Sequence, residues 1–87
     1  MMRKKAVALR YGEELPAPFV LAKGTGVHAD RLIELARTYE IPITPAHSLA
    51  ETLFEVDIGE MIPESVYEAV AQLLIFFSRV GERSDRA

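Results

Sequence analysis

Two histidines, one serine and a glycine-rich turn are the residues whose types and spacing could support chemistry. His28 and His47 are the only imidazoles; they fall on separate predicted elements with no clear third metal ligand, so no metal site is expected. The sequence has no cysteine, which excludes thiol catalysis, disulfides and cysteine-based zinc sites. Ser48 has no partner base that its spacing would supply, and it is better explained as a helix cap. No catalytic site is predicted.

The segment GTGVHA, Gly24 to Ala29, follows a predicted strand and opens a predicted helix, so it matches the G-x-G-x-x-G/A dinucleotide pattern. In such sites the amides of a helix N-terminus hold a phosphate. The acidic residue expected at the end of the next strand is absent, because IPITPA offers only Thr44, and the chain is short for a dinucleotide crevice. A tight strand-to-helix turn is favoured, with no cofactor; nucleotide or anion binding at Gly24–Ala29 remains the alternative.

Charge is distributed unevenly along the chain. The formal net charge is −3 over 87 residues, yet four basic residues lie within residues 3–10. Between Arg37 and Arg79 there is no lysine or arginine, while seven acidic residues fall in that interval. A nucleic-acid-binding protein would need a broad basic face, so no nucleic-acid partner is expected. The acidic side is either a solvated surface or a contact surface for a basic partner.

Length and hydropathy indicate one small domain without membrane insertion. A chain of 87 residues is near the size at which a single core is just sufficient. Its most apolar stretch, Ala69 to Phe77, is interrupted by Gln72 and falls short of the roughly 20 residues of a spanning helix. The apolar run after MMRKK is too short for a signal peptide. We expect one domain over residues 1–81 and a flexible tail over residues 82–87.

Hydrophobic periodicity predicts six elements in the order β-β-α-β-α-α. The predicted strands are Ala6–Tyr11, Phe19–Lys23 and Ile41–Thr44. A helix is predicted from Gly26 to just before Pro42, a short helix from Ser48 to about Glu55, and a last helix between Pro63 and Gly81. The unit from Phe19 to Thr44 is expected to be a right-handed crossover joining parallel strands. The predicted fold is a small α/β domain with a three-stranded mixed sheet and helices packed on it.

Two local features of the helices are also predicted. Ser48 and Glu51 have the spacing of a capping box, in which the serine oxygen and the glutamate carboxylate each accept a backbone N–H. Ile75 and Phe76 fall outside the inner stripe of the last helix, where they either contact a small core or form a docking patch. The stripe itself consists of Val66, Val70, Leu73, Leu74 and Phe77.

Several segments together resemble the cytoplasmic domain of the type III secretion export-switch proteins, the FlhB/YscU family. The segments are KAVALRY, APFVLAKGTG, IPI and LAETLFEVDIGEMIPESVYEAVAQLL. The resemblance runs from about Ala6 to Phe77. Its most specific positions are Ile58-Gly59, Ile62-Pro63, Tyr67 and Ala69-Val70-Ala71.

The resemblance implies a membrane-embedded half ahead of this domain in family members, and a self-cleaving Asn-Pro-Thr-His motif between the two. The asparagine side chain there attacks its own backbone carbonyl; the pieces stay associated, and export switches from early to late substrates. In this sequence the four motif positions hold Met1, Met2, Arg3 and Lys4, which offer neither the carboxamide nor the proline. The chain is therefore similar to the post-cleavage C-terminal fragment made separately, and it is expected to be non-enzymatic.

The resemblance also implies a binding site. In the family, the strand ahead of the motif belongs to the same sheet, so an empty place is expected beside the first strand of this chain, where another chain can add a strand. Nearby basic residues would attract an acidic partner; the alternative is a sheet that simply ends there, protected by charge. The candidate partner-binding residues are Ala6, Val7, Ala8, Leu9 and Arg10.

The implied partners are proteins of the flagellar export apparatus, including the membrane half of a full-length switch protein. The implied location is the cytoplasm, at the inner face of the membrane through export components. The sequence leaves open a virulence injectisome instead of a flagellum, and an adaptor redeployed outside secretion.

Overall fold

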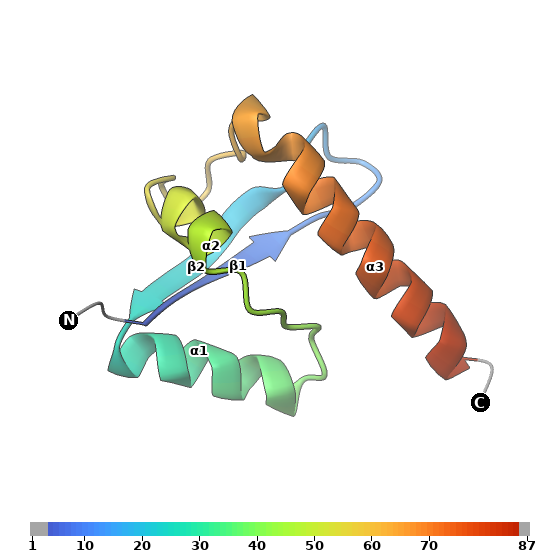
Figure 1. Cartoon of the computed structure of the whole chain (residues 1–87), viewed down its shortest axis with the longest axis horizontal. Coiled ribbons are helices and arrows are strands. Elements are labelled where there is room, and N and C mark those ends of the chain that lie inside the picture. The colour runs from blue at the N-terminus through green and yellow to red at the C-terminus, as the bar shows by residue number, and fades with distance from the viewer. Residues whose placement is uncertain (1–3, 86–87) are drawn as a thin grey trace.

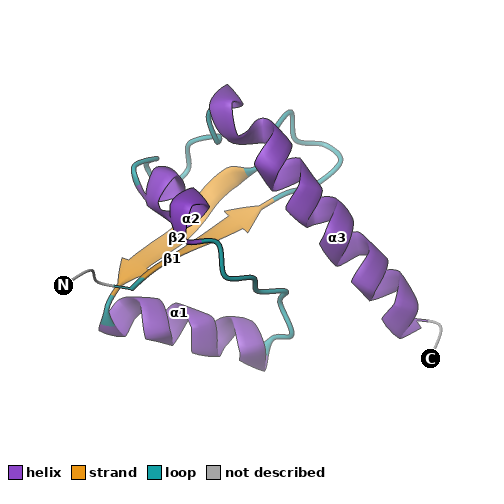
Figure 2. Ribbon diagram, viewed as in Figure 1, coloured by secondary structure: helices purple, strands orange, loops and turns teal. Residues whose placement is uncertain are grey.

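The computed structural model describes the backbone of residues 4–85 and the side chains of residues 4–77. An antiparallel hairpin forms its centre, with α1 and α2 on opposite sides of it and α3 running away from the hairpin loop (Figure 1, Figure 2). The elements are β1 (Lys5–Arg10), β2 (Phe19–Thr25), α1 (Val27–Thr38), α2 (His47–Phe54), the 3₁₀ helix η1 (Glu64–Val66) and α3 (Tyr67–Asp85). Within the described backbone, no helix is both long and apolar enough to cross a membrane.

The hairpin register changes once along its length. Lys5 pairs with Thr25, and the pairing continues to Ala8 opposite Ala22 before it shifts, so that Leu9 lies opposite Val20. The additional residue lies on β2, which makes it a β-bulge of that strand and leaves β1 regular. A β-bulge commonly blunts a sheet edge, and here it is on the strand whose outer edge is already covered.

Residues 41–44 do not form the predicted third strand. The described chain has a two-stranded antiparallel sheet, so the predicted mixed sheet and the parallel crossover from Phe19 to Thr44 are wrong. Glu40 ends α1 in the left-handed region with φ 56°, and the Ile41 N–H donates to Ala36 O at 2.7 Å. This Schellman-type arrangement consumes the first donor of the segment, and Pro42 has none to offer. Ile43 and Thr44 keep their N–H groups, but in an extended segment these point to opposite edges, so only one donor is left on either side for a ladder.

The two faces of the hairpin pack differently because their side chains differ in size. Alternation along the strands places Ala6, Ala8, Ala22 and Gly24 on the face toward α1, where small residues let the helix approach closely. Ala29 of α1 is fully buried. The opposite face carries the main core, in which Leu53 of α2, Ile62 and Val70 of α3 are buried and are contacted by Val7, Leu9, Leu49, Val66 and Leu74.

The core confirms most of the predicted stripe of the last helix. Val70 is buried, Val66 and Leu74 pack against the core, and Leu73 and Phe77 are half-buried. Ile75 and Phe76 are 54% and 58% exposed, so they lie outside the stripe as predicted. The helix continues past Gly81 to Asp85, so the predicted stop at Gly81 is wrong. Residues 86–87 lie outside the described residues, and the flexibility of the tail over residues 82–87 stays a prediction.

The predicted capping box at the start of α2 is also wrong. The helix begins at His47 with Ala46 as its N-cap residue, and no side chain caps it. The Glu51 carboxylate instead pairs with the ammonium of Lys5 on β1, which lies 3.1 Å from it. An ion pair with a half-buried lysine therefore replaces the local hydrogen bond that the spacing predicted.

Lys23 fixes the other end of α2 to the sheet. Its Nζ donates to the carbonyl oxygens of Phe54 and Val56, each at 2.8 Å, and lies 5.1 Å from the centre of the Phe54 ring. The last carbonyls of a helix have no partners within the helix and carry partial negative charge, so an ammonium is a favourable cap there. The lysine thus joins β2 to α2.

Candidate partner-binding edge

The hydrogen-bonding pattern of the hairpin shows which backbone groups of β1 point away from β2. The Gly26 N–H donates to Lys4 O at 2.9 Å, which makes residues 4 and 26 a hydrogen-bonded pair of the ladder. Such pairs alternate along an antiparallel ladder, so Ala6 and Ala8 also direct their N–H and C=O groups toward β2. The groups that point to the outer edge belong to Lys5, Val7 and Leu9.

This outer edge is open within the described part of the chain. Apart from the β2 ladder, no backbone hydrogen bond joins Lys5, Val7 or Leu9 to another described segment. The outer edge of β2 is occupied instead, because the Val20 N–H donates to Glu60 O at 3.0 Å and the Val20 carbonyl oxygen accepts from the Gly59 N–H at 2.8 Å. Among the described residues, the hairpin therefore has one protected edge, on β2, and one unpaired edge, on β1.

Basic side chains lie at both ends of the open edge. Lys4 pairs with Asp30 of α1 at 2.6 Å, and both of these side chains are more than half exposed. Arg10 is exposed, and no ion pair holds it among the described residues. Of the four positions that correspond to the cleavage motif, only Lys4 is described; Met1, Met2 and Arg3 lie outside the described residues.

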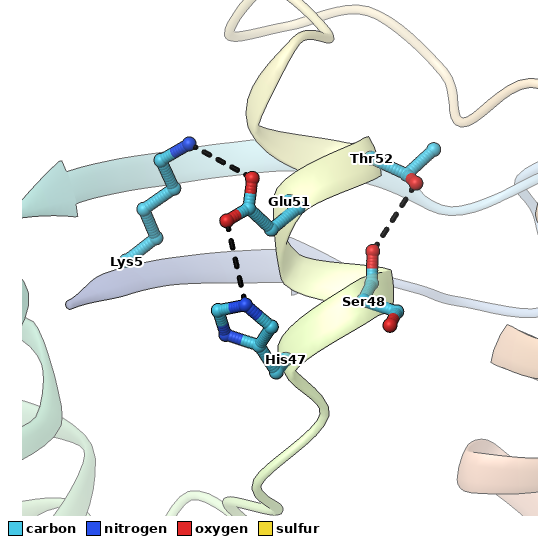
Figure 3. Close-up of polar contacts among 5 residues, drawn as sticks. All are labelled: Lys5, His47, Ser48, Glu51 and Thr52. Atoms are coloured by element: carbon cyan, nitrogen blue, oxygen red, sulfur yellow. Dashed lines mark hydrogen bonds and ion pairs between the residues drawn. The ribbon is translucent and has the colours of Figure 1, made fainter. Parts of the chain in front are cut away.

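Lys5 connects the edge to α2 through a short network (Figure 3). One Glu51 oxygen lies 3.1 Å from Lys5 Nζ, and the other lies 3.5 Å from Nε2 of His47 in the first turn of α2. Lys5 Nζ is also 5.3 Å from the centre of the Phe54 ring. Lys5 lies at the edge but was not among the sequence candidates, since only the ladder register reveals its outward backbone groups.

The strand register divides the five predicted partner-binding residues into those whose backbone groups point outward and those whose backbone groups point toward β2. Val7 and Leu9 offer outward backbone groups, while their side chains pack against the core. Ala6, Ala8 and Arg10 use their backbone groups toward β2, so they border the edge through their side chains alone. An aspartate at Val7 or Leu9 would therefore disturb the core as much as the edge.

The glycine-rich turn has a packing explanation. A Cβ on Gly24 would come within 2.9 Å of the backbone of His28, so only glycine fits where β2 meets α1. Gly26 has φ 56°, a conformation that glycine adopts readily. The first turn of α1 carries the acidic residue Asp30, and a negative charge there disfavours an anion at that end of the helix. These features support the tight turn.

The remaining candidates for chemistry lie on two helices, with His28 on α1 and with His47 and Ser48 in the first turn of α2. His28 and His47 are exposed on α1 and α2 respectively, and α2 begins at His47, one residue before the predicted start at Ser48. Ser48 accepts a hydrogen bond through its backbone oxygen from the Thr52 hydroxyl at 3.2 Å (Figure 3). This is an ordinary bond within a helix, and it gives the serine hydroxyl no activating base.

Comparison with known proteins identifies the family. The family model described as "FlhB HrpN YscU SpaS Family" matches residues 3–77. The uncharacterized protein YlqH of Bacillus subtilis is 38% identical over 80 residues, which cover 91% of this chain and 86% of that protein. The flagellar biosynthetic protein FlhB of Yersinia enterocolitica is 46% identical over 71 residues, covering 79% of this chain but 18% of the FlhB.

Solved structures agree with the sequence relatives. The cytoplasmic domain of FlhB from Shewanella putrefaciens is 39% identical with a TM-score of 0.79, covering 83% of this chain and 62% of that one. A mutated EscU C-terminal domain gives 34% identity and a TM-score of 0.81, covering 86% and 93% of the two chains. With the family model matching most of its length, this chain belongs to the FlhB/HrpN/YscU/SpaS family.

Proposed function

We propose that this chain is a non-enzymatic, protein-binding component of a bacterial type III export apparatus, with the flagellar apparatus preferred. It acts as the counterpart of the post-cleavage C-terminal fragment of the export-switch protein, and it modulates or partly replaces that fragment when export changes from early to late substrates. The observation that carries the proposal is its likeness in sequence and fold to the cytoplasmic domain of FlhB. Such a protein would work in the cytoplasm, at the inner face of the membrane.

The open edge of β1 supplies the contact in this proposal. Three outward N–H groups and three outward C=O groups, on Lys5, Val7 and Leu9, form the template that an added strand requires. The partners are export apparatus proteins, among them the membrane half of a full-length switch protein. Binding by strand addition needs no catalytic group.

A proline at residue 7 tests the edge without breaking the hairpin ladder. The Val7 N–H points outward, so Val7→Pro removes a donor for the partner and leaves the bonds to β2 in place. Val7→Ala is the matched control, because it loses the same packing against the core but keeps the donor. We expect Val7→Ala to capture export components from flagellated cells and Val7→Pro to lose them, with both variants folded by circular dichroism.

A second readout tests the export role itself. In a strain whose own switch protein lacks its cytoplasmic half, this chain and Val7→Ala should restore some motility, and Val7→Pro should not. If Val7→Ala and Val7→Pro restored motility equally, the open edge of β1 would not be the contact that the export role uses. Failure of the unmodified chain both to capture export components and to restore motility would leave an adaptor outside secretion as the better explanation.

A further inference from the structure

We propose that the open edge of β1 takes an extended segment of a partner protein that carries one carboxylate at each end and apolar residues between them. The inference rests on the proposed use of this edge and adds the chemistry of its occupant. Strand addition alone selects no sequence, because it uses only backbone groups. The side chains that border the edge must therefore supply the selection.

The basic residues at the two ends of the edge favour acidic residues in the occupant. Lys4 and Arg10 are six residues apart, so the alternation of a strand places them on the same face. Arg10 is exposed without an ion pair in the described chain, and the Lys4 side chain remains 58% exposed although it contacts Asp30. Opposite charges on directly facing residues of neighbouring strands stabilise the pair. Carboxylates six residues apart in the occupant would face both cations in either strand direction.

The apolar residues in the middle of the edge favour apolar residues in the occupant. Val7 and Leu9 are half-buried and pack against the cluster of Leu53, Ile62 and Val70. Occupant residues opposite these two positions would lie beside the same cluster, where apolar and β-branched side chains fit. Figure 1 shows the connector between α1 and α2 on the β1 side of the hairpin. This connector contains Ile41 and Ile43, which are 56% and 44% exposed.

The same charges disfavour a second copy of this chain as the occupant. Antiparallel pairing of two β1 strands about Val7 would place Arg10 of one copy opposite Lys4 of the other. Like charges at directly opposed positions destabilise a strand pair. The charges at the edge therefore favour a strand with acidic ends and disfavour pairing with β1 of a second copy of this chain.

Two seven-residue peptides test this chemistry on the purified chain. One has glutamate at its first and last positions and valine at its second and fourth; the matched control has lysine at the two ends. We expect the glutamate peptide to bind roughly 4- to 25-fold more tightly, since each exposed pair contributes roughly two- to fivefold. Arg10→Gln should reduce that preference by roughly two- to fivefold, and the preference should weaken as salt is added.

Amide hydrogen exchange by NMR locates the peptide. Binding should newly protect the amides of Lys5, Val7 and Leu9, while those of Ala6 and Ala8 are protected beforehand by β2. Equal affinity of the two peptides, protection at other sites, or no binding at millimolar peptide would each overturn the inference. Protection of the three amides that depends on protein concentration without peptide would overturn it in favour of a second copy.

The outcomes separate this inference from the proposed function. Capture of export components without selection for the glutamate peptide would contradict the acidic-ended occupant and leave the export role standing. Selective peptide binding without capture of export components would support the occupant and contradict the export role.

Discussion

Two lysines of the hairpin reach the same ring of α2 but make contacts of different quality. Lys23 caps two carbonyls at the end of the helix, whereas Lys5 is shared between a half-exposed carboxylate and the face of Phe54. Hydrogen bonds from a charged group are stronger than exposed ion pairs, because the latter are weakened by water and by side-chain entropy. The two residues should therefore differ in their effect on stability.

Lys23→Met is expected to lower the free energy of unfolding by about 1–3 kcal/mol, because it leaves the carbonyls of Phe54 and Val56 without their donor. The matched variant Lys5→Met is expected to cost about 0–1 kcal/mol. Urea denaturation followed by circular dichroism measures both values. A larger loss for the Lys5 variant would contradict the assignment of Lys23 as the cap.

Glu40 is the one described residue other than glycine with positive φ, at 56°. A side chain with a Cβ is disfavoured in this region, and glycine is the usual residue at this position of a helix C-terminus. Glu40→Gly is therefore expected to stabilise the protein by about 1 kcal/mol. Glu34→Gly within α1 is the control and should destabilise it by about 1 kcal/mol. Thermal unfolding measures both changes. If Glu40→Gly lowered Tm as Glu34→Gly does, the backbone at Glu40 would not be strained.

At the scale of elements, the helices and strands whose buried face is determined by the local sequence pattern were predicted from the sequence. The alternation in β1, the apolar run of β2 and the helical periodicity of α1 and α3 each specify a buried face without reference to other segments. The segment 41–44 has a strand-like pattern as well, but a strand also needs a neighbour with free hydrogen-bonding groups. Local reasoning cannot supply that neighbour, and the end of α1 uses the first donor of the segment.

The candidate site shows the same division between local and non-local information. The basic residues and the strand at the N-terminal end were visible in the sequence. Which groups face outward depends on the register with β2, fixed by the pairing of Gly26 with Lys4. The capping-box prediction was wrong for a related reason: Glu51 forms an ion pair with Lys5, which is 46 residues away in the sequence.

The exposed and buried sides of α3 should respond differently to truncation. Val70 is 2% exposed in the core, and Phe76 is 58% exposed although it is the larger side chain. Val70→Ala is expected to cost about 2 kcal/mol through lost burial and a residual cavity, while Phe76→Ala should cost less than about 0.5 kcal/mol. Guanidinium titration compares them. A costly Phe76→Ala would show that its ring contributes to the fold.

The domain, as far as its residues are described, combines a small core with an unpaired strand edge. Its buried apolar side chains are few: Ala17, Val20, Ala29, Leu53, Ile62 and Val70 among the described residues. Small domains have little stability to spare, because a short chain buries a smaller fraction of its surface. A strand added beside β1 would satisfy outward backbone groups and extend the core face at Val7 and Leu9. Occupancy of the edge should therefore affect the stability of the entire domain.

This coupling predicts that an acidic-ended strand raises Tm. A ligand that binds only the folded state adds roughly 1.4 kcal/mol at ten times its Kd, equivalent to roughly 6–11 °C for a domain of this size. Differential scanning calorimetry over a peptide series measures the shift. Val7→Ala should retain the dependence on peptide concentration from a lower starting Tm, and Val7→Pro should lose it. A shift of equal size in both variants would mean that the peptide binds elsewhere, because the outward N–H of residue 7 distinguishes them.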